Sequence, residues 1–321
     1  MELTPEEARE RCREKGWVTQ YERVATMVGK REDRVLLVED HPTPTGAEWM
    51  IRQYAATSPL VERAWREGRR HFFLLRVGRA DLSLEPSVRA AGVERVEVVD
   101  DEVRITHAGL AGAGVGAALA RGCAEGVLRV KIHEEGGGSR LGRGTVITPK
   151  LRRLLIGVDD TDTRERGATW SAVDVVCRRL EEEWDGELFY SRHVIVQLYP
   201  GTPGRTQNCA AVAVELGVEP GRVEEAKEEF LSLLSEYCFS DCTWVAFWEE
   251  LEVPRSVVDL GHAAKLRVVE LEEVEEVIER EGIEVVGLGE RERGKIGAVA
   301  ALAFIDRPEL AARVPRSLPR P

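Results

Sequence analysis

The chain lacks several features that mark whole classes of protein. No stretch of its 321 residues approaches the roughly 20 consecutive apolar residues that a membrane-spanning helix needs. The charged start, Thr4-Pro5-Glu6-Glu7, lacks the apolar core of a signal peptide. The six cysteines include no Cys-x-x-Cys pair, so a closed zinc site is not favoured and buried reduced thiols are expected. These absences predict a cytoplasmic protein without a membrane partner.

The first half of the chain has almost equal numbers of basic and acidic residues, whereas the second half has a large excess of acidic ones. Residues 1–150 hold 24 Lys and Arg against 23 Asp and Glu, whereas residues 151–321 hold 21 against 34. The net charge therefore changes from +1 to −13 near Pro149. Because the length suits two domains and the composition shifts here, we expect domains at 1–149 and 150–321. The acidic second half argues against wrapping a long stretch of nucleic acid.

Two stretches of the first half are candidates for anion binding. A helix expected over 58–67 carries Arg63 and Arg66, and more arginines follow it. Such a basic cluster is typical of a surface that binds an anion, and the alternative is a helix face that is simply exposed to solvent. The glycine-rich stretch His107–Gly116 lies between an expected strand and an expected helix, which is the setting of a phosphate-binding loop. Its spacing matches no Gly-x-Gly-x-x-Gly motif, so close packing of glycines on a sheet is the alternative.

The stretch Leu154–Thr163 is the strongest functional signal. Its apolar run ends in Asp159, Asp160 and Asp162, a pattern typical of a buried strand that delivers carboxylates to its carboxyl end. Open α/β sheets bind ligands at that edge. Clustered carboxylates repel one another unless they share a cation, and hard oxygen ligands suit magnesium. The alternative is an Asx turn that caps the helix beginning near Thr169.

The expected elements of the second half follow a recognisable order. Strands are expected over 154–158, 188–198, 210–216 and 243–248, and helices over 169–184 and 220–237. This β-α-β-β-α-β order predicts a ferredoxin-like sheet in an α/β (α+β) protein, with a helix, a strand and a helix as a C-terminal extension. We expect the first strand at the centre, beside the strand that follows the first helix. The donor-rich loop 199–208 suggests ligand contact.

Three blocks of the second half resemble the catalytic region of archaeal isoleucine-tRNA agmatinyl-cytidine synthetases. The blocks are Gly157-Val158-Asp159-Asp160-Thr161-Asp162-Thr163, Pro200-Gly201-Thr202-Pro203-Gly204-Arg205-Thr206-Gln207-Asn208 and Arg293-Gly294-Lys295-Ile296-Gly297-Ala298-Val299-Ala300-Ala301. They occur in the family's order, which makes the match more specific than any single motif. The resemblance implies a kinase-like domain that uses ATP and magnesium, followed by a ferredoxin-like one.

The resemblance and the residue chemistry together imply a site for Mg²⁺ and ATP. The expected metal ligands are Asp159, Asp160 and Asp162. The expected catalytic residues are Asp160, Asp162, Thr169 and Arg205. The expected cofactor-binding residues are Gly157, Thr161, Gly167, Thr206, Asn208 and Lys295. We expect Arg205 to bind the phosphates, because its planar guanidinium group can donate two parallel hydrogen bonds to phosphate oxygens.

The chain also departs from that family. The family's Gly-Met-Cys-Thr has become Gly167-Ala168-Thr169-Trp170, and Gln197 stands where the family has an arginine. The OB-fold and zinc-ribbon regions with which the family holds tRNA have no counterpart, and an unrelated first half is present instead. The tRNA reaction itself is therefore not expected to carry over.

A second resemblance covers the whole length. The block Asp159-Asp160-Thr161-Asp162-Thr163, with Gly167-Ala168-Thr169-Trp170 after it and Thr106–Gly116 before it, is similar to methanogenesis marker protein 11. This resemblance implies that the protein comes from a methanogenic archaeon. It does not imply a particular reaction, because none is established for the family.

We therefore expect a Mg-ATP-dependent transferase or ligase that moves a phosphoryl or nucleotidyl group. Its partners are a nucleotide and a small-molecule or protein acceptor in methanogen metabolism. One alternative is an enzyme that modifies nucleic acid such as tRNA, which is not favoured. The other is a non-catalytic protein that senses nucleotide. The sequence specifies neither the acceptor nor the oligomeric state.

Overall fold

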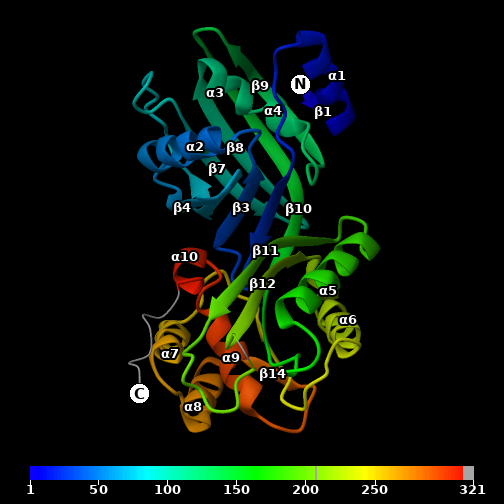
Figure 1. Cartoon of the computed structure of the whole chain (residues 1–321). Helices are drawn as coiled ribbons and strands as arrows, with labels where there is room; N and C mark the ends of the chain where they lie inside the picture. The colour runs from blue at the N-terminus through cyan, green and yellow to red at the C-terminus, as the bar shows by residue number, and fades with distance from the viewer. Residues whose placement is uncertain (207, 314–321) are drawn as a thin grey trace. The chain divides into compact units, whose positions relative to one another are not determined.

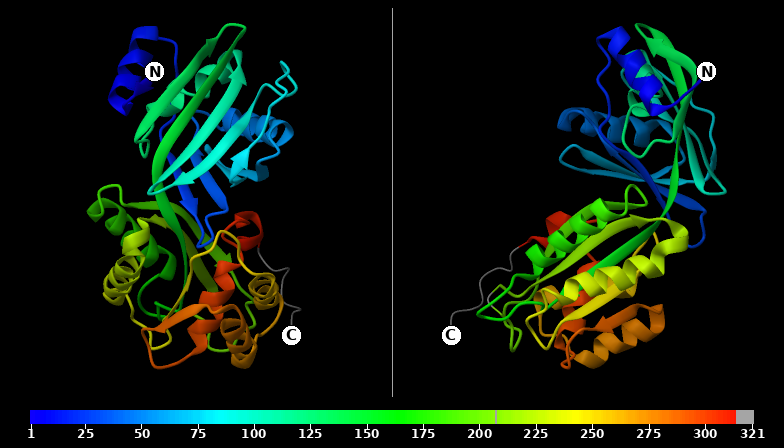
Figure 2. Two further views of the ribbon diagram at one scale, coloured as in Figure 1. Left: turned by 180° about the vertical axis from the view of Figure 1, so that it is seen from behind. Right: turned by 90° about the vertical axis from the view of Figure 1, so that its right-hand side faces the viewer.

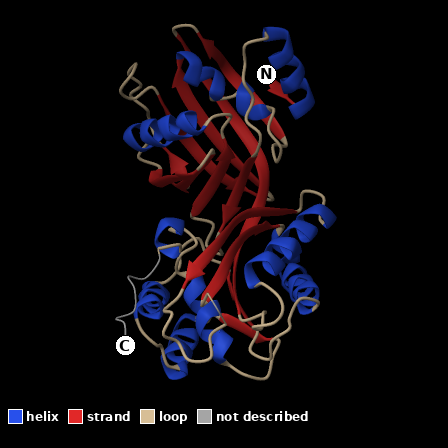
Figure 3. Cartoon of the chain, in the orientation of Figure 1, coloured by secondary structure: helices blue, strands red, loops and turns tan. Residues whose placement is uncertain are grey.

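The computed structural model of the chain describes residues 1–206 and 208–313. Contacts between Cα atoms divide the chain into two compact units, Met1–Leu151 and Arg152–Pro321 (Figure 1). Each unit combines helices with antiparallel strands, so the protein is of the expected mixed α/β class (Figure 3). No helix in the described ranges is long and apolar enough to cross a membrane.

The first unit contains the same strand arrangement twice, which the sequence analysis did not detect. The first copy consists of β2 (Val24–Val28), β3 (Arg34–Asp40), α2 (Pro44–Thr57), β4 (Val61–Glu67) and β5 (Arg70–Arg76). The second consists of β7 (Ala91–Val99), β8 (Glu102–Leu110), α3 (Ala111–Gly116), α4 (Leu119–Gly122), β9 (Arg129–Gly137) and β10 (Arg140–Asp159). In each copy two hairpins flank a helical connection, and the second and fourth strands lie side by side.

Short elements complete this unit. They are β1 (Glu2–Leu3), α1 (Pro5–Lys15) and β6 (Gly78–Arg79). Helix α1 begins with a capping box between Thr4 and Glu7 and ends at Gly16, whose φ of 70° is left-handed. These local signals are readable from the sequence because capping involves only neighbours in the chain.

The prediction of a helix over residues 58–67 is wrong. Residues Val61–Glu67 form strand β4, which pairs with β5. The expected basic patch is also neutralised by acids: Arg66 pairs with Glu48, Arg69 with Glu22 and Arg70 with Asp40. Pairing with β5 overrides the local helical pattern, because sheet hydrogen bonds depend on a partner strand.

The second unit has the expected element order. After β10 come α5 (Thr169–Glu183), β11 (Leu188–Gln197), β12 (Ala210–Val218), η1 (Pro220–Arg222), α6 (Val223–Ser235) and β13 (Trp244–Trp248). The extension contains α7 (Arg255–Leu266), α8 (Leu271–Glu281), β14 (Glu284–Gly287), α9 (Arg293–Leu302) and α10 (Pro308–Ala311). It therefore has one long helix, α7, that was not expected.

The strand order of this unit corrects one expectation. Residues 152–159 of β10 pair with β12 on one side and β13 on the other, and both pairings are antiparallel. The strand after the first helix, β11, is the neighbour of β12 and not of β10. The order is therefore β11-β12-β10-β13-β14.

Helices cover both faces of this sheet (Figure 2). Leu154, Ile156 and Val158 of β10 pack with α5 and α6, whereas Leu155 packs on the side of α7, α8 and α9. This alternation follows from the strand period of two. Gly157 allows α9 to approach closely, because a Cβ atom there would lie 1.9 Å from the carbonyl oxygen of Ala298.

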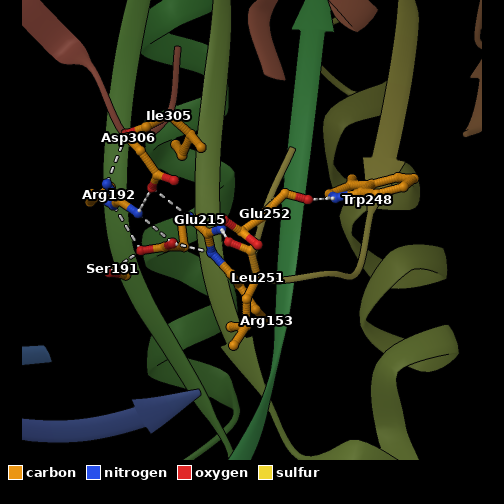
Figure 4. A network of polar contacts seen from close by, with 9 residues as sticks. All are labelled: Arg153, Ser191, Arg192, Glu215, Trp248, Leu251, Glu252, Ile305 and Asp306. Carbon is orange, nitrogen blue, oxygen red and sulfur yellow. Dashed lines mark hydrogen bonds and ion pairs between the residues drawn. The ribbon is translucent and has the colours of Figure 1, made fainter. Parts of the chain in front are cut away.

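A buried polar network ties three strands of the second unit to the segment after α9 (Figure 4). The carboxylate of Glu215 on β12 accepts hydrogen bonds from Arg153 at 2.6 Å and from Arg192 at 2.6 Å. Both arginines also donate to Oδ1 of Asp306 at 2.7 Å. Two positive and two negative side chains thus compensate one another where isolated charges would be costly.

Candidate functional site

Strand pairing brings the acids and the long loop to one edge of the second unit's sheet. Asp159 and Asp160 stand at the carboxyl end of β10. Because β12 runs antiparallel to β10, its first residues and the loop before it lie at this edge. The loop and the acids therefore lie at one edge because β12 is the neighbour of β10, where the strand after the first helix was expected.

A cavity of about 50 Å³ lies at this edge. Its lining includes the charged or polar side chains of Asp159, Asp160, Arg205, Thr206, Arg267 and Arg293. Two carboxylates therefore share one cavity with three guanidinium groups from the loop, α9 and the end of α7. Arginine clusters of this kind match phosphate oxygens, and paired carboxylates match a divalent cation.

Asp160 occupies a sharp turn at the centre of the site. Its φ of 57° is left-handed, which aspartate tolerates better than most residues. Its amide donates to Oδ1 of Asp159 at 2.9 Å, and its carbonyl accepts from the hydroxyl of Thr243 at 2.9 Å. Its carboxylate accepts from Nε of Arg293 at 2.9 Å. The turn thus points two consecutive acids into one site, which a regular strand could not do.

Burial and neighbouring carboxylates shift the pKa values of both acids. Burial raises the pKa of Asp159 well above its usual value, and the charges of Asp160 and Asp162 raise it further. Burial also raises the pKa of Asp160, against the opposing hydrogen bond and charge of Arg293, and the charge of Asp162 adds to the rise. Carboxyl groups with raised pKa values in a cavity are typical of sites that hold a cation or handle a proton.

Arg293 and Arg267 are the site residues that the sequence analysis missed. Nη1 of Arg293 donates to the carbonyl of Gly204 at 2.6 Å, so this side chain joins α9 to the loop as well as to Asp160. The signal for Arg293 was present, because it opens the third resemblance block, but Lys295 was chosen from that block. No local pattern marked Arg267.

Asp162, Thr161 and Thr169 form a separate cluster at the start of α5. The hydroxyl of Thr169 donates to Oδ1 of Asp162 at 3.2 Å and accepts from the hydroxyl of Thr161 at 3.0 Å. None of the three lines the cavity. Asp162 still acts on the site through its charge, which raises the pKa values of both Asp159 and Asp160. The cluster does not cap α5, because this helix begins after Ala168 without a side-chain cap.

The remaining expected residues lie outside the cavity or serve packing. Gly157 admits α9, and Gly167 has a φ of 93° with Phe239 2.8 Å from the position of a Cβ atom. Asn208 is exposed, and its carbonyl accepts from Gln197 at 2.7 Å. Nζ of Lys295 donates to Glu292 at 2.6 Å and lies 4.4 Å from the ring centroid of Trp244. Gln207 lies outside the described residues.

A second cluster of acids in this unit is already neutralised. In the described part of the chain, Glu224, Glu249 and Glu284 come close enough to share a cation. However, Nζ of Lys227 donates to all three carboxylates at 2.7 to 2.9 Å. The lysine therefore takes the place that a metal ion would need.

Comparison with known proteins identifies a relative of nearly the same length. The chain is 44% identical over 294 residues to Uncharacterized protein MJ0921 of Methanocaldococcus jannaschii, covering 92% of this chain and 97% of that protein. The chain belongs to the family of this protein. The resemblance to methanogenesis marker protein 11 stays a prediction.

The second unit carries a further similarity. Residues 155–244 match the model of the TiaS TCKD domain. The chain is 29% identical over 153 residues to the isoleucine-tRNA 2-agmatinylcytidine synthetase TiaS of Pyrobaculum neutrophilum. This match covers 47% of this chain and 35% of that enzyme, so the chain spans about a third of its length. The expected resemblance to this synthetase family is confirmed for this region.

Solved structures of TiaS show a partial likeness. The complex of TiaS with its isoleucine tRNA and ATP is 25% identical, with a TM-score of 0.42 over 47% of this chain and 36% of that chain. The complex of TiaS with the same tRNA, AMPCPP and agmatine is 22% identical, with a TM-score of 0.41 over the same shares.

Proposed function

We propose that the second unit binds Mg-ATP and transfers a phosphoryl or nucleotidyl group to an acceptor. The observation that carries this proposal is the meeting of Asp159 and Asp160 with Arg205, Arg267 and Arg293 at one cavity. Phosphoryl and nucleotidyl transfer need little covalent help beyond charge stabilisation and positioning. The match of residues 155–244 to the TiaS TCKD domain supports the same chemistry.

The residues fit a magnesium ion. Asp159 and Asp160 are adjacent, largely buried and raised in pKa, so an added cation relieves their mutual repulsion. Bound Mg²⁺ supplies charge neutralisation between the phosphates and the carboxylates. Arg205, Arg267 and Arg293 would supply positive charge for the phosphates, and Thr206 would supply a hydroxyl. Arg293 binds Oδ2 of Asp160, so Oδ1 of the same carboxylate could hold the cation beside it.

The acceptor in this proposal is an RNA, with a small-molecule or protein acceptor of methanogen metabolism as the second choice. This ranking reverses the expectation from the sequence. It rests on the Pyrobaculum relative, which is named for its action on tRNA. The acidic character of residues 151–321 limits the contact to a short segment of RNA, because a long one would meet net repulsion.

A regulatory protein that binds ATP without turnover is the second candidate function. One observation favours it. Gln197 stands where the resembling family has an arginine, and the amide of its side chain donates to the carbonyl of Asn208 at 2.7 Å. ATP binding without release of ADP or pyrophosphate, in the presence of RNA, would favour this reading.

Calorimetric titration of the full chain with Mg-ATP tests the main proposal. We expect saturable binding that Asp160→Asn weakens by roughly tenfold or more, the scale of a lost charged interaction. Asparagine also tolerates the left-handed turn at this position, so the variant should keep its fold. Asp259→Asn, an exposed residue of α7, is the matched control and should bind like the wild type. Equal affinity of the wild type and Asp160→Asn would overturn the proposal.

A further inference from the structure

A second cavity, of about 420 Å³, lies in the first unit. Three segments line it: the residues that follow α1, the loop and first turns of α2, and the helical connection of the second strand repeat. Its size is that of a small-molecule site. No part of the proposed ATP chemistry uses it.

Two tryptophans and a tyrosine contribute to the lining of this cavity. Trp17 and Trp49 line it and are 63% and 40% exposed, unusually high values for the largest apolar side chain. Tyr21, which is buried, lines it as well. Exposed tryptophans around a hollow mark a binding surface, and their π faces favour a flat ring as the ligand.

The electrostatics favour an uncharged ligand. No Asp, Glu, Lys or Arg side chain lines the cavity. Burial and the nearby His71 lower the pKa of His41, so this lining residue is neutral at pH 7. Behind the wall, Arg121 lies 4.6 Å from the ring centroid of Tyr21 and pairs with Glu39 at 2.8 Å. A cationic ligand would find no carboxylate here, and a strongly anionic one would find no unpaired cation.

Polar atoms without partners lie at the same place. Nδ1 of His41 bonds to the backbone of Thr43 at 3.0 Å, whereas its Nε2 has no partner among the described residues. Nδ1 of His71 is buried and equally unpartnered within the described chain. The ring of His71 lies 6.2 Å from the rings of Tyr21 and His41. The ring of His41 is half-buried and lines the cavity, so its Nε2 is open to a polar ring atom of a ligand, whereas the buried His71 is not part of the lining.

The glycine-rich stretch has two roles here. Gly109 and Gly114 allow close backbone packing, because a Cβ atom on Gly114 would lie 2.6 Å from the amide of Gly142. Gly112 and Gly116 line the cavity instead, and a Cβ atom on Gly112 would meet nothing within 4 Å. Packing thus explains part of the stretch, while Gly112 keeps the cavity open.

We propose that this cavity binds an uncharged planar heterocycle of the nucleobase class, with its ring against Trp17 and Trp49 and a ring heteroatom on Nε2 of His41. The heterocycle comes either from a free nucleoside or from an unstacked base of single-stranded RNA. This site is separate from the proposed ATP site and does not rest on it.

Equilibrium dialysis of the full chain against adenosine, guanosine, cytidine and uridine, and against a mixed-sequence single-stranded RNA, tests the proposal. We expect saturable binding that Trp17→Ala and Trp49→Ala each weaken by about tenfold, the scale of one base-stacking contact. Gly112→Leu should abolish binding with an unchanged melting temperature, because its side chain enters open space. Nucleosides carry no phosphate, so Asp160→Asn should leave their binding unchanged even if Mg-ATP binding fails.

The control is Trp170→Ala, which removes a tryptophan that is 53% exposed in the second unit. It should bind like the wild type. Binding of nucleosides identifies a small-molecule source, whereas binding of RNA alone, with the same response to the variants, identifies an unstacked base. Absence of binding by both probes, or binding that Trp17→Ala and Trp49→Ala leave intact, would overturn the proposal whether or not Gly112→Leu folds.

Discussion

Nε of Arg293 donates to Oδ2 of Asp160 at 2.9 Å, and the two residues lie 133 positions apart in the chain. The same guanidinium reaches the carbonyl of Gly204 through Nη1. The ion pair raises the pKa of Arg293 despite the opposing effect of burial. A guanidinium therefore binds Oδ2 of the carboxylate that a metal ion would use, so the two positive charges would compete for the negative charge of Asp160.

Arg293→Met should reveal this competition. At about pH 8, Mg²⁺ alone should bind more tightly by roughly tenfold, because one charge-assisted hydrogen bond to Asp160 is gone. ATP without Mg²⁺ should bind more weakly, since a cation facing the phosphates is lost. Calorimetry with each ligand separately measures both effects. Unchanged affinity for Mg²⁺ would show that Arg293 does not guard the metal position.

Arg205 should clamp the phosphates from the loop. Arg205→Ala should weaken Mg-ATP binding by roughly tenfold or more, the scale of a hydrogen bond to a charged group. Arg205→Lys should recover only part of this loss, because a point charge does not replace a bidentate fork. Competition binding with a fluorescent ATP analogue compares the three proteins. Equal binding by the wild type and Arg205→Ala would place the phosphates elsewhere.

Binding of Mg-ATP should weaken as the pH falls. The pKa values of Asp159 and Asp160 are raised, and the carboxyl groups must lose their protons to bind a cation. In the absence of a cation, the raised pKa values of the two acids also affect folding. Their contribution to the free energy of unfolding is highest at low pH, where both carboxyl groups are protonated, and it falls as the pH rises through their folded pKa values. Calorimetry between about pH 8 and about pH 5, in buffers of different ionisation enthalpy, should detect proton release on binding. Asp159→Asn should reduce that release.

Gly157 should be needed for folding, because it admits α9. A Cβ atom at this position would lie 1.9 Å from the carbonyl oxygen of Ala298, so α9 would have to move. Gly157→Ala should lower the free energy of unfolding by about 1–3 kcal/mol, the usual cost of overpacking. Gly221→Ala is the control, since its nearest contact is the flexible carboxylate of Glu219. Full stability with lost Mg-ATP binding would instead support a direct cofactor role for Gly157.

Glu215 should hold the buried network together. Burial by itself raises the pKa of this carboxyl, but the charges of Arg192 and Arg153 outweigh it and hold the pKa far below its usual range. Glu215→Gln should lower the free energy of unfolding by about 3–5 kcal/mol, because two buried guanidinium groups lose one of their two carboxylate charges and keep only that of Asp306. Urea denaturation measures the loss, and Glu183→Gln in an exposed pair should cost less than about 1 kcal/mol.

The same network has a defined pH dependence. Because the folded pKa of Glu215 is depressed, its contribution is fully present above the unfolded value and is lost as the pH falls through the folded one. The stability difference between the wild type and Glu215→Gln should therefore shrink on acidification. A difference that is constant from neutral to strongly acidic pH would contradict the ion-pair explanation.

Features that depend on neighbours in the chain were readable from the amino-acid sequence. The apolar run before Asp159, the capping box of α1 and the β-α-β-β-α-β order are local patterns, because hydrogen bonding and side-chain alternation set them within a few residues. The resemblance blocks likewise located the acids and the loop that carries Arg205.

Which side chains share a cavity depends on contacts between segments far apart in the chain, so local patterns did not show it. Asp160 enters it through a left-handed turn while Asp162 bonds to Thr169, and no spacing rule separates these two acids. Arg293 reaches Asp160 because α9 packs against Gly157, a contact between distant segments. The repeat and the tryptophan-lined cavity of the first unit depend equally on strand pairing across long separations. Such contacts follow from shape complementarity and register, which local patterns do not encode.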